Sequence, residues 1–230
     1  DSCNEATDSC SQVPSDALCD DGLHCSGVET CNASLGCQAG TNPCTPLSCN
    51  EATDSCGSTT VTFTSVAAQD GWVLESTETS GDDNADKQYR SVVSFDTSSL
   101  PDGATILSAT LRLRRGPVSG TNPFTTHGTC WVDVQNGGFS GSTTLTTGDF
   151  QAAATASQAA SMSNAAANND WSEGSLNASG RSAVSKTGTT QLRVYFNLDD
   201  NDDTGNDYLG YYSGDNGTAA NRPQLVVTYQ

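Results

Sequence analysis

Hydrophobic and polar residues alternate one by one along much of the chain after residue 60. The segment 191–198, Gln-Leu-Arg-Val-Tyr-Phe-Asn-Leu, is the clearest case, and in 107–113 a leucine or alanine stands at every second position. A period of two is typical of a β-strand that buries one face. Both segments are therefore expected to be half-buried strands.

Other short apolar segments extend this pattern through the rest of the chain. Clusters of Gly, Asn, Asp and Pro separate them, and that number and spacing of short strands favours an antiparallel β-sandwich. The further predicted strands are 61–66, 72–75, 91–95, 129–135, 208–212 and 224–229. One segment differs: the Ala-rich stretch 149–162 is expected to be a short helix in a long connection, capped by Gly148 and Asp149.

The first 57 residues have a different composition. Nine of the ten cysteines lie there, and the nonapeptide Ser-Cys-Asn-Glu-Ala-Thr-Asp-Ser-Cys occurs at 2–10 and again at 48–56. This segment has no Lys or Arg and too few apolar residues for a core, so disulfides are expected to hold it. We therefore predict two domains, a Cys-rich repeat arm at 1–57 (the arm) and a β-sandwich at 58–230. The offset of the two nonapeptides suggests that the chain begins inside the tail of one repeat and then contains one full unit.

The sequence does not determine how the cysteines pair. Nine is an odd number, so one cysteine of the arm lacks a partner within it. Cys130 is either that partner or a free thiol on the apolar face of its strand with Val132 and Val134. In a third alternative, Cys3 or Cys10 is bonded to an upstream repeat or to another subunit. Zinc is disfavoured because the spacings are not paired C-x-x-C, and the density of cysteines predicts an oxidising, extracellular location. The predicted disulfide cysteines are Cys3, Cys10, Cys19, Cys25, Cys31, Cys37, Cys44, Cys49, Cys56 and Cys130.

The charge of the chain limits its partners. The formal net charge is −18, with nine acidic and no basic residues in the arm and eighteen acidic against nine basic residues elsewhere. Nucleic acid is not expected as a partner, because phosphates are bound by clustered Lys and Arg. The one basic cluster, Arg112, Arg114 and Arg115, fits the solvent face of a strand. No apolar run is long enough to span a membrane.

Several motifs resemble one family of secreted proteins. The stretch 90–113, RSVVSFDTSSLPDGATILSATLRL, resembles the signature of the DNRLRE-type β-sandwich domains of bacteria and archaea. The segments YYSG at 211–214 and NRPQLVVTY at 221–229 are similar to the closing strands of that family. The middle part of the family is similar to residues 128–134 and 149–152 of this chain.

This resemblance covers roughly residues 60–230. It implies a jelly-roll-like fold, an extracellular or cell-surface location, and non-catalytic roles that include polysaccharide binding and surface architecture. It does not fix a ligand. The arm more loosely resembles the Cys-rich repeats of bacterial surface proteins.

An acidic loop is the candidate metal site. Calcium takes six to eight oxygen ligands in flexible geometry and would offset the repulsion among the carboxylates of 199–207. A structural calcium ion is therefore predicted as the cofactor. The alternative is a solvated acidic loop, or carboxylates that pair with Arg222 and cap backbone amides. The candidate ligands are Asp199, Asp200, Asn201, Asp202, Asp203 and Asp207. A weaker second candidate, Asp82, Asp83, Asn84 and Asp86, fits a polar turn better.

No enzymatic activity is expected. His24 and His127 do not stand in a nucleophile, metal or acid–base motif. Exposed aromatic residues either stack on sugar rings or become covered at an interface. The candidates for either role are Trp131, Trp171 and Tyr211, and the same two alternatives apply to Trp72 and Tyr208. Separately, Asn32, Asn177 and Asn216 begin Asn-x-Ser/Thr glycosylation motifs.

Two functions follow as expectations. In the first, the chain is a non-catalytic extracellular structural or adhesive surface protein that assembles with copies of itself or with other surface proteins, as in a head-to-tail filament. In the second, the sandwich is a carbohydrate-binding module of a larger secreted, polysaccharide-active protein, and the arm is a spacer.

Overall fold

The computed structural model describes residues 2–4, 9–11, 15–45, 47–74, 88–199 and 206–230. The chain divides into two compact units, residues 1–59 together with Gln230, and residues 60–229. The predicted boundary lay between residues 57 and 58. Each unit is described by itself below.

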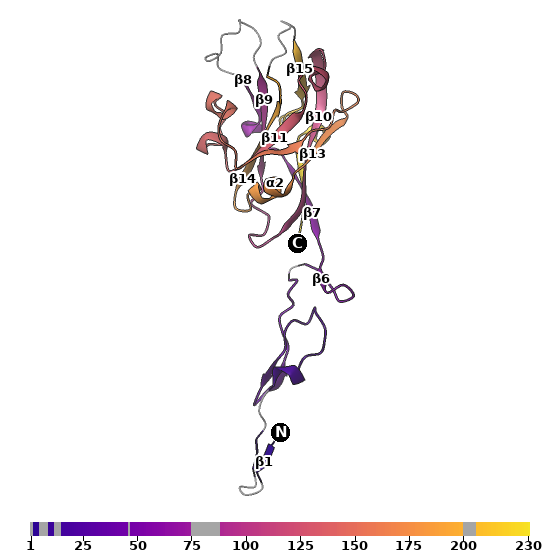
Figure 1. Ribbon diagram of the computed structural model, residues 1–230, viewed down its shortest axis with the longest axis vertical. Coiled ribbons are helices and arrows are strands. Elements are labelled where there is room, and N and C mark those ends of the chain that lie inside the picture. Colours follow the sequence, from indigo (N-terminus) through magenta and orange to yellow (C-terminus); the bar gives the residue numbers. More distant parts are fainter. Residues whose placement is uncertain (1, 5–8, 12–14, 46, 75–87, 200–205) are drawn as a thin grey trace. The chain divides into compact units, whose positions relative to one another are not determined.

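The second unit is a sandwich of two five-stranded antiparallel sheets (Figure 1). One sheet has the strand order β13-β10-β16-β7, and β15 pairs with the far part of the long strand β10. Its strands are β7 (Thr59–Thr64), β10 (Ile106–Gly120), β13 (Trp171–Ser175), β15 (Asp207–Tyr211) and β16 (Gln224–Tyr229). The other sheet has the order β12-β11-β14-β9-β8. Its strands are β8 (Gly71–Leu74), β9 (Tyr89–Asp96), β11 (Cys130–Asn136), β12 (Ala156–Ser161) and β14 (Thr189–Phe196).

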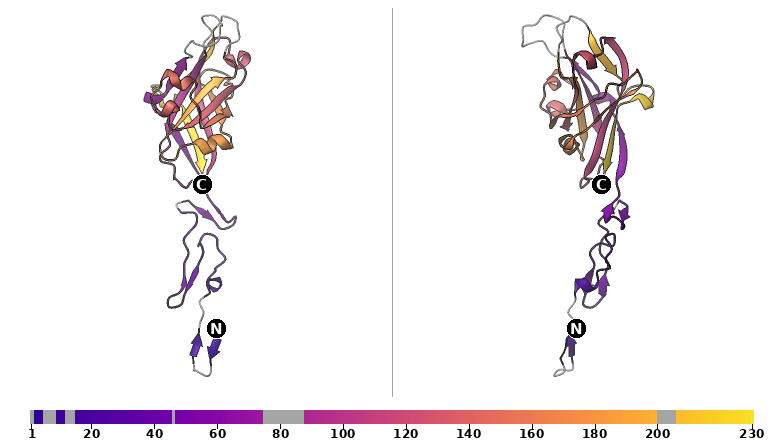
Figure 2. Two further views of the ribbon diagram at one scale, coloured as in Figure 1. Left: turned by 60° about the vertical axis from the view of Figure 1, so that its left-hand side comes forward. Right: turned by 45° about the vertical axis from the view of Figure 1, so that its right-hand side comes forward.

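The connectivity is that of a jelly roll. The first strand, β7, pairs with the last, β16, which pairs in turn with β10. The chain crosses between the sheets from β7 to β8, from β9 to β10, from β10 to β11, from β12 to β13, from β13 to β14 and from β14 to β15. Figure 2 shows the two layers from further sides. This wrapping of two Greek keys leaves few open sheet edges. The predicted all-β, jelly-roll-like class is confirmed.

Residues that alternate along the strands fill the space between the sheets. Phe95, Leu111 and Leu192 are fully buried there, and Leu225 and Val227 meet them from β16. This is the half-buried pattern predicted for 107–113, in which Ala109, Leu111 and Leu113 are buried and the residues between them are not.

The expected helix at 149–162 is wrong. A short 3-10 turn (Thr147–Phe150) is followed by β12, which pairs with β11. Helix propensity of alanine is a weak preference that tertiary packing overrides. Here the small side chains have a packing role, because a Cβ added at Gly180 of α2 (Ala178–Ala183) would lie 2.8 Å from the Cβ of Ala159. Strand β13 was not predicted either.

The outer face of the second sheet is covered by residues 137–155. Phe139 and Phe150 of this segment form a second apolar cluster with Val73 and Val92, and the amide of Phe139 donates to Gln191 Oε1 at 2.8 Å. Strand β14 is therefore buried on both faces rather than half-buried as its alternation suggested.

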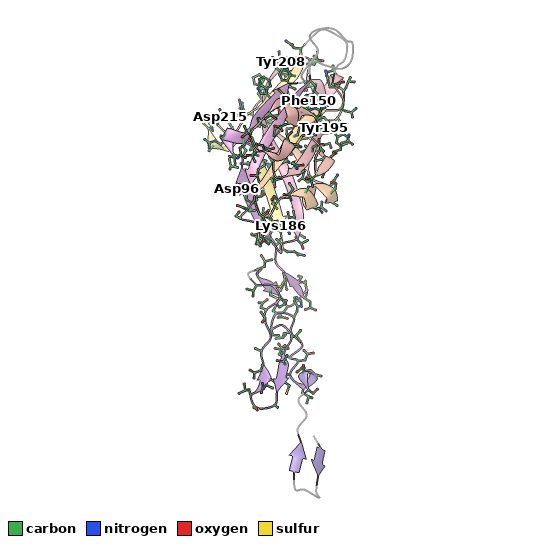
Figure 3. The ribbon with its side chains drawn as sticks, turned by 90° about the vertical axis from the view of Figure 1, so that its left-hand side faces the viewer. Asp96, Phe150, Lys186, Tyr195, Tyr208 and Asp215 are labelled. Atoms are coloured by element: carbon green, nitrogen blue, oxygen red, sulfur yellow. A yellow bond between two sulfur atoms is a disulfide. The ribbon has the colours of Figure 1, made fainter. Side chains whose placement is uncertain are left out.

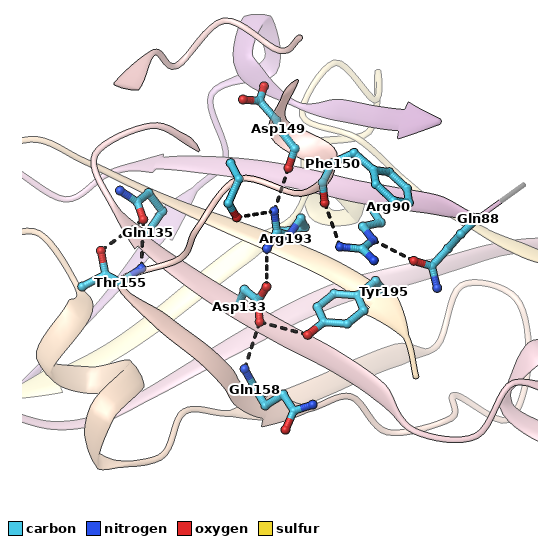
Figure 4. A network of polar contacts seen from close by, with 11 residues as sticks. Gln88, Arg90, Asp133, Gln135, Asp149, Phe150, Thr155, Gln158, Arg193 and Tyr195 are labelled. Atoms are coloured by element: carbon cyan, nitrogen blue, oxygen red, sulfur yellow. Dashed lines mark hydrogen bonds and ion pairs between the residues drawn. The ribbon is translucent and has the colours of Figure 1, made fainter. Parts of the chain in front are cut away.

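Two charged side chains lie beneath this cover (Figure 4). Arg193 Nη2 donates to Asp133 Oδ2 at 2.5 Å, and Arg193 Nη1 donates to the carbonyls of Asp149 and Ala152 at 2.7 and 2.9 Å. The amide of Gln158 also donates to Asp133, at 2.9 Å. The pair thus ties β11 and β14 to the covering segment.

The described residues of the arm form three two-stranded antiparallel pairs and a short 3-10 helix (Figure 1). The ends of the two nonapeptide copies pair in the same register, with Cys3 opposite Cys10 and Cys49 opposite Cys56. The elements are β1 (Ser2–Asn4), β2 (Ser9–Ser11), η1 (Asp16–Leu18), β3 (Thr30–Asn32), β4 (Gly36–Gln38), β5 (Cys49–Asn50) and β6 (Ser55–Cys56). Carboxylates supplement the sparse backbone pairing; Glu51, for example, accepts from the amides of His24 and Cys25.

Disulfides hold the arm, as the cysteine density predicted. They join Cys19 to Cys37, Cys25 to Cys49 and Cys44 to Cys56. In the described part of the chain, no helix is both long and apolar enough to cross a membrane.

Candidate functional site

Three exposed aromatic side chains meet at one end of the sandwich. Trp72, Tyr89 and Tyr208 are 62, 44 and 45 % exposed. The ring centroids of Trp72 and Tyr89 are 5.2 Å apart in an edge-on arrangement, and those of Tyr89 and Tyr208 are 5.7 Å apart. Figure 3 shows Tyr208 at the end of the sandwich opposite Lys186. The three residues come from β8, β9 and β15, so both sheets contribute to the group.

Strand alternation explains why these rings are exposed. Tyr89, Ser91, Val93 and Phe95 share one face of β9, and the last two are buried in the core between the sheets. Trp72 lies opposite Ser91 on β8. The same strand face that fills the core thus continues beyond it and presents Tyr89 and Trp72 to solvent.

The aromatic residues line a pocket of about 520 Å³. Val93 and Leu113 of the core also line it, together with the polar residues Asp70, Ser91, Ser213 and Asp215. A largely apolar pocket with a few polar groups that fix orientation is the usual form of a small-ligand site. We refer to it as the aromatic pocket.

Asp70 holds two walls of the aromatic pocket together. Its Oδ1 accepts from the amide of Ser94 at 2.9 Å and its Oδ2 from the amide of Gly214 at 3.0 Å. Gly214 has to lack a side chain, because a Cβ there would lie 2.6 Å from Asp70 Oδ2. Burial raises the pKa of the Asp70 carboxyl above its usual range, and the charge of Asp215 adds to this effect, whereas the two amide hydrogen bonds oppose it.

Of the three aromatic residues put forward from the sequence, Tyr211 lines the aromatic pocket, whereas Trp131 and Trp171 are not among its lining residues. All three side chains are packed. Trp131 is half-buried, and within the described residues its buried indole nitrogen has no hydrogen-bond partner. Trp171 is in contact with the guanidinium groups of Arg112 and Arg114, whose central carbons are 4.5 and 4.2 Å from its ring centre. Tyr211 packs against the core, and its hydroxyl lies 3.3 Å from Ser172 Oγ.

The basic cluster is occupied by contacts within the sandwich. Arg112 pairs with Glu173 at 2.7 Å, and Arg114 and Arg115 donate to the carbonyls of Asn169 and Ala165. These contacts fix the segment that leads into β13.

Cys130 is a free thiol in the sandwich core and forms no bridge to the arm. Burial raises the pKa of the Cys130 thiol to about 12. Because the thiolate is the reactive form, we expect this cysteine to be unreactive in the folded protein. In the arm Cys31 is also unbonded and is partly exposed.

Most of the predicted calcium loop, Asp200, Asn201, Asp202 and Asp203, lies outside the described residues, as do Asp82, Asp83, Asn84 and Asp86. Asp199 is exposed. Asp207 Oδ1 accepts from the amide of Thr121 at 3.0 Å, and its Oδ2 is 3.9 Å from His127 Nδ1. A hydrogen bond from Thr126 is the main cause that lowers the pKa of the Asp207 carboxyl. Asp207 thus caps a backbone amide, while Arg222 donates to the carbonyl of Asn216.

The glycosylation motifs lie in turns and at a helix start. Asn32 and Asn177 are exposed, and Asn216 is half-buried. Asn177 caps α2 by accepting from the amide of Gly180 at 2.9 Å, and its side-chain nitrogen donates to the carbonyl of Gln158 at 3.3 Å.

Comparison with protein-family models finds no match for this chain, and a search of curated proteins finds none either. The resemblance to DNRLRE-type domains stays a prediction. The fold and the aromatic pocket define the class that the geometry supports, a jelly-roll sandwich with a surface pocket lined by aromatic side chains.

Sequence reasoning missed Tyr89 and did not bring the aromatic residues together. Trp72 and Tyr208 each stand at the start of a predicted strand, and this position was the available signal. The strand topology places Trp72 and Tyr208 at the same end of the sandwich, and the spacing of these residues in the sequence does not show this.

Proposed function

We propose that this chain is a non-catalytic, extracellular adhesive surface protein whose sandwich binds carbohydrate in the aromatic pocket. The single observation that carries the proposal is the group of Trp72, Tyr89 and Tyr208. These three exposed side chains come from both sheets and line one pocket. Aromatic faces stack on the apolar faces of sugar rings, and neighbouring hydroxyls and carboxylates accept hydrogen bonds from sugar hydroxyls. The disulfides of the arm support an oxidising, extracellular setting.

The charge of the chain points to neutral glycans or amino sugars. Asp70 and Asp215 line the pocket, and the formal net charge is −18. Polyanionic polysaccharides would be repelled by this field.

The state of Asp70 supports binding rather than catalysis. A carboxyl group with a raised pKa near a second carboxylate is also a feature of glycoside hydrolases. Here, however, each oxygen of Asp70 already accepts a backbone amide. A general acid needs an oxygen that reaches the glycosidic bond.

Affinity electrophoresis through gels that contain soluble neutral polysaccharides tests the proposal. We expect Trp72→Ala to weaken retention at least about tenfold, which corresponds to about 1.4 kcal/mol of binding free energy. Leu107→Ala is the matched control, because Leu107 is an exposed apolar residue of the sandwich that does not line the pocket. Equal retention of both variants would contradict the proposal, and release of reducing sugar by the wild-type protein would contradict its non-catalytic part.

Assembly into a head-to-tail filament is a second candidate, and one observation favours it. Cys31 is an unbonded, partly exposed cysteine within a disulfide-rich unit, and such a residue is suited to an intermolecular bond. Electron microscopy of the secreted protein before and after reductant tests this candidate. We expect Cys31→Ser to remove fibres that reductant also disperses, whereas fibres that persist in the variant would show that Cys31 does not link the copies.

A further inference from the structure

Three carboxylates lie close together in the arm. Oxygen atoms of Asp20, Asp21 and Glu29 all lie within 4.8 Å of one another. The arm contains no Lys or Arg. Three like charges at this separation repel one another, and this repulsion opposes folding of the arm.

Glu29 supplies the independent observation. Its side chain is only 9 % exposed, and within the described residues its buried Oε1 has no hydrogen-bond partner. A buried carboxylate oxygen without a donor or a cation is strongly unfavourable. The position of Glu29 therefore indicates a positively charged ligand.

The two aspartates are held in place by local contacts. Asp20 Oδ1 accepts from the amide of Gly22 at 2.8 Å, and Asp21 Oδ1 accepts from the amide of Leu23 and the hydroxyl of Ser26, both at 2.9 Å. Disulfides at Cys19 and Cys25 flank this turn. The carboxylates of Asp20 and Asp21 thus lie on a turn that disulfides restrain, close to the carboxylate of Glu29.

We propose that Asp20, Asp21 and Glu29 bind a calcium ion that stabilises the arm. An all-oxygen, carboxylate-rich donor set suits calcium, which completes its coordination with backbone carbonyls and water. Among the described residues of the arm, two other groups of potential ligands include Cys25, Cys44 or Cys49. All three sulfurs are in disulfides, and metal binding by cysteine requires the thiolate. This site is independent of carbohydrate binding and of the acidic loop at 199–207.

Isothermal titration calorimetry tests the proposal. Calcium chloride is titrated into the full chain after its disulfides have formed and a chelator has removed bound metal. Glu29→Gln removes the central charge with little change in shape, and Asp54→Asn is the matched control. Asp54 lies in the same arm and lines the same cavity as Glu29, but it is not one of the three clustered residues. Asparagine also tolerates its positive φ of 48°.

We expect a dissociation constant of about 10⁻⁴ to 10⁻³ M, the range of extracellular calcium modules. Glu29→Gln should lose one site, or weaken it at least about tenfold, and Asp54→Asn should retain it. Comparison of the two variants separates this site from any other calcium site of the chain. The same number and affinity of sites in Glu29→Gln, or no binding by the wild-type protein, would overturn the proposal.

A second measurement does not depend on counting sites. Calcium should slow the reduction of the arm disulfides by dithiothreitol in the wild-type protein and in Asp54→Asn, but not in Glu29→Gln. In calcium-free buffer Glu29→Gln should be at least as resistant to reduction as wild type, because the substitution relieves repulsion. A thiol count before each experiment shows whether the disulfides have formed, and Asp20→Asn replaces Glu29→Gln if they have not. Calcium protection that persists in the substituted protein would refute the site.

Discussion

Replacing Arg193 with methionine would break the most deeply buried ion pair of the described residues. The side chains of Arg193 and Asp133 are 5 and 3 % exposed and 2.5 Å apart. Methionine fills a similar volume but leaves the Asp133 carboxylate without its counter-charge, and the carbonyls of Asp149 and Ala152 lose their donor.

The expected loss is large for one substitution. Removing one partner of a buried ion pair costs about 3–5 kcal/mol, because the remaining charge stays buried. For a domain of this size that loss corresponds to a fall in Tm of roughly 6–20 °C. The double variant Asp133→Leu/Arg193→Met should lose less, because it leaves no unpaired charge.

Urea unfolding followed by tryptophan fluorescence measures this loss, since all three tryptophans lie in the sandwich. Glu173→Gln is the control, because it breaks the ion pair of Arg112 and Glu173, whose side chains are 30 and 47 % exposed. Such a pair contributes at most about 1 kcal/mol. A loss below about 1 kcal/mol for Arg193→Met, or one equal to that of the control, would refute the assigned role of the buried pair.

The remaining predictions concern Cys130. Its pKa of about 12 predicts that iodoacetamide at pH 8.5 leaves Cys130 unmodified in the folded protein and modifies it after unfolding. Mass spectrometry of the labelled peptides measures this difference. Labelling of Cys130 at equal rates in both states would contradict its burial. Burial raises the pKa of the folded thiol above its ordinary value of 9.0, so the contribution of this thiol to stability is complete below pH 9 and is lost as the pH rises toward 12. Cys130→Val should therefore show a smaller decline in unfolding free energy between pH 8 and 10.5 than the wild-type protein, and identical slopes would count against this reasoning.

The sequence alone was sufficient for the strands that alternate clearly and for the nature of the arm, but not for β12 and β13. Alternation over 107–113 and 191–198 located β10 and β14, because a strand with a buried face repeats every two residues wherever it lies. Nine cysteines without a compensating core required disulfides. Their pairing was beyond the sequence, since Cys49 and Cys56 face each other across a hairpin and yet bond to Cys25 and Cys44.

Tertiary structure decided the features that depend on neighbours distant in the chain. The alanines of 156–161 form a strand because β11 pairs with them and because α2 packs against their small side chains, an effect that outweighs local helix preference. Arg193 and Asp133 are buried because residues 137–155 fold over a sheet face that alternation alone assigns to solvent. The aromatic pocket and the carboxylate group at Glu29 arise in the same way, because each brings together residues whose proximity is set by folding and is not encoded in their spacing.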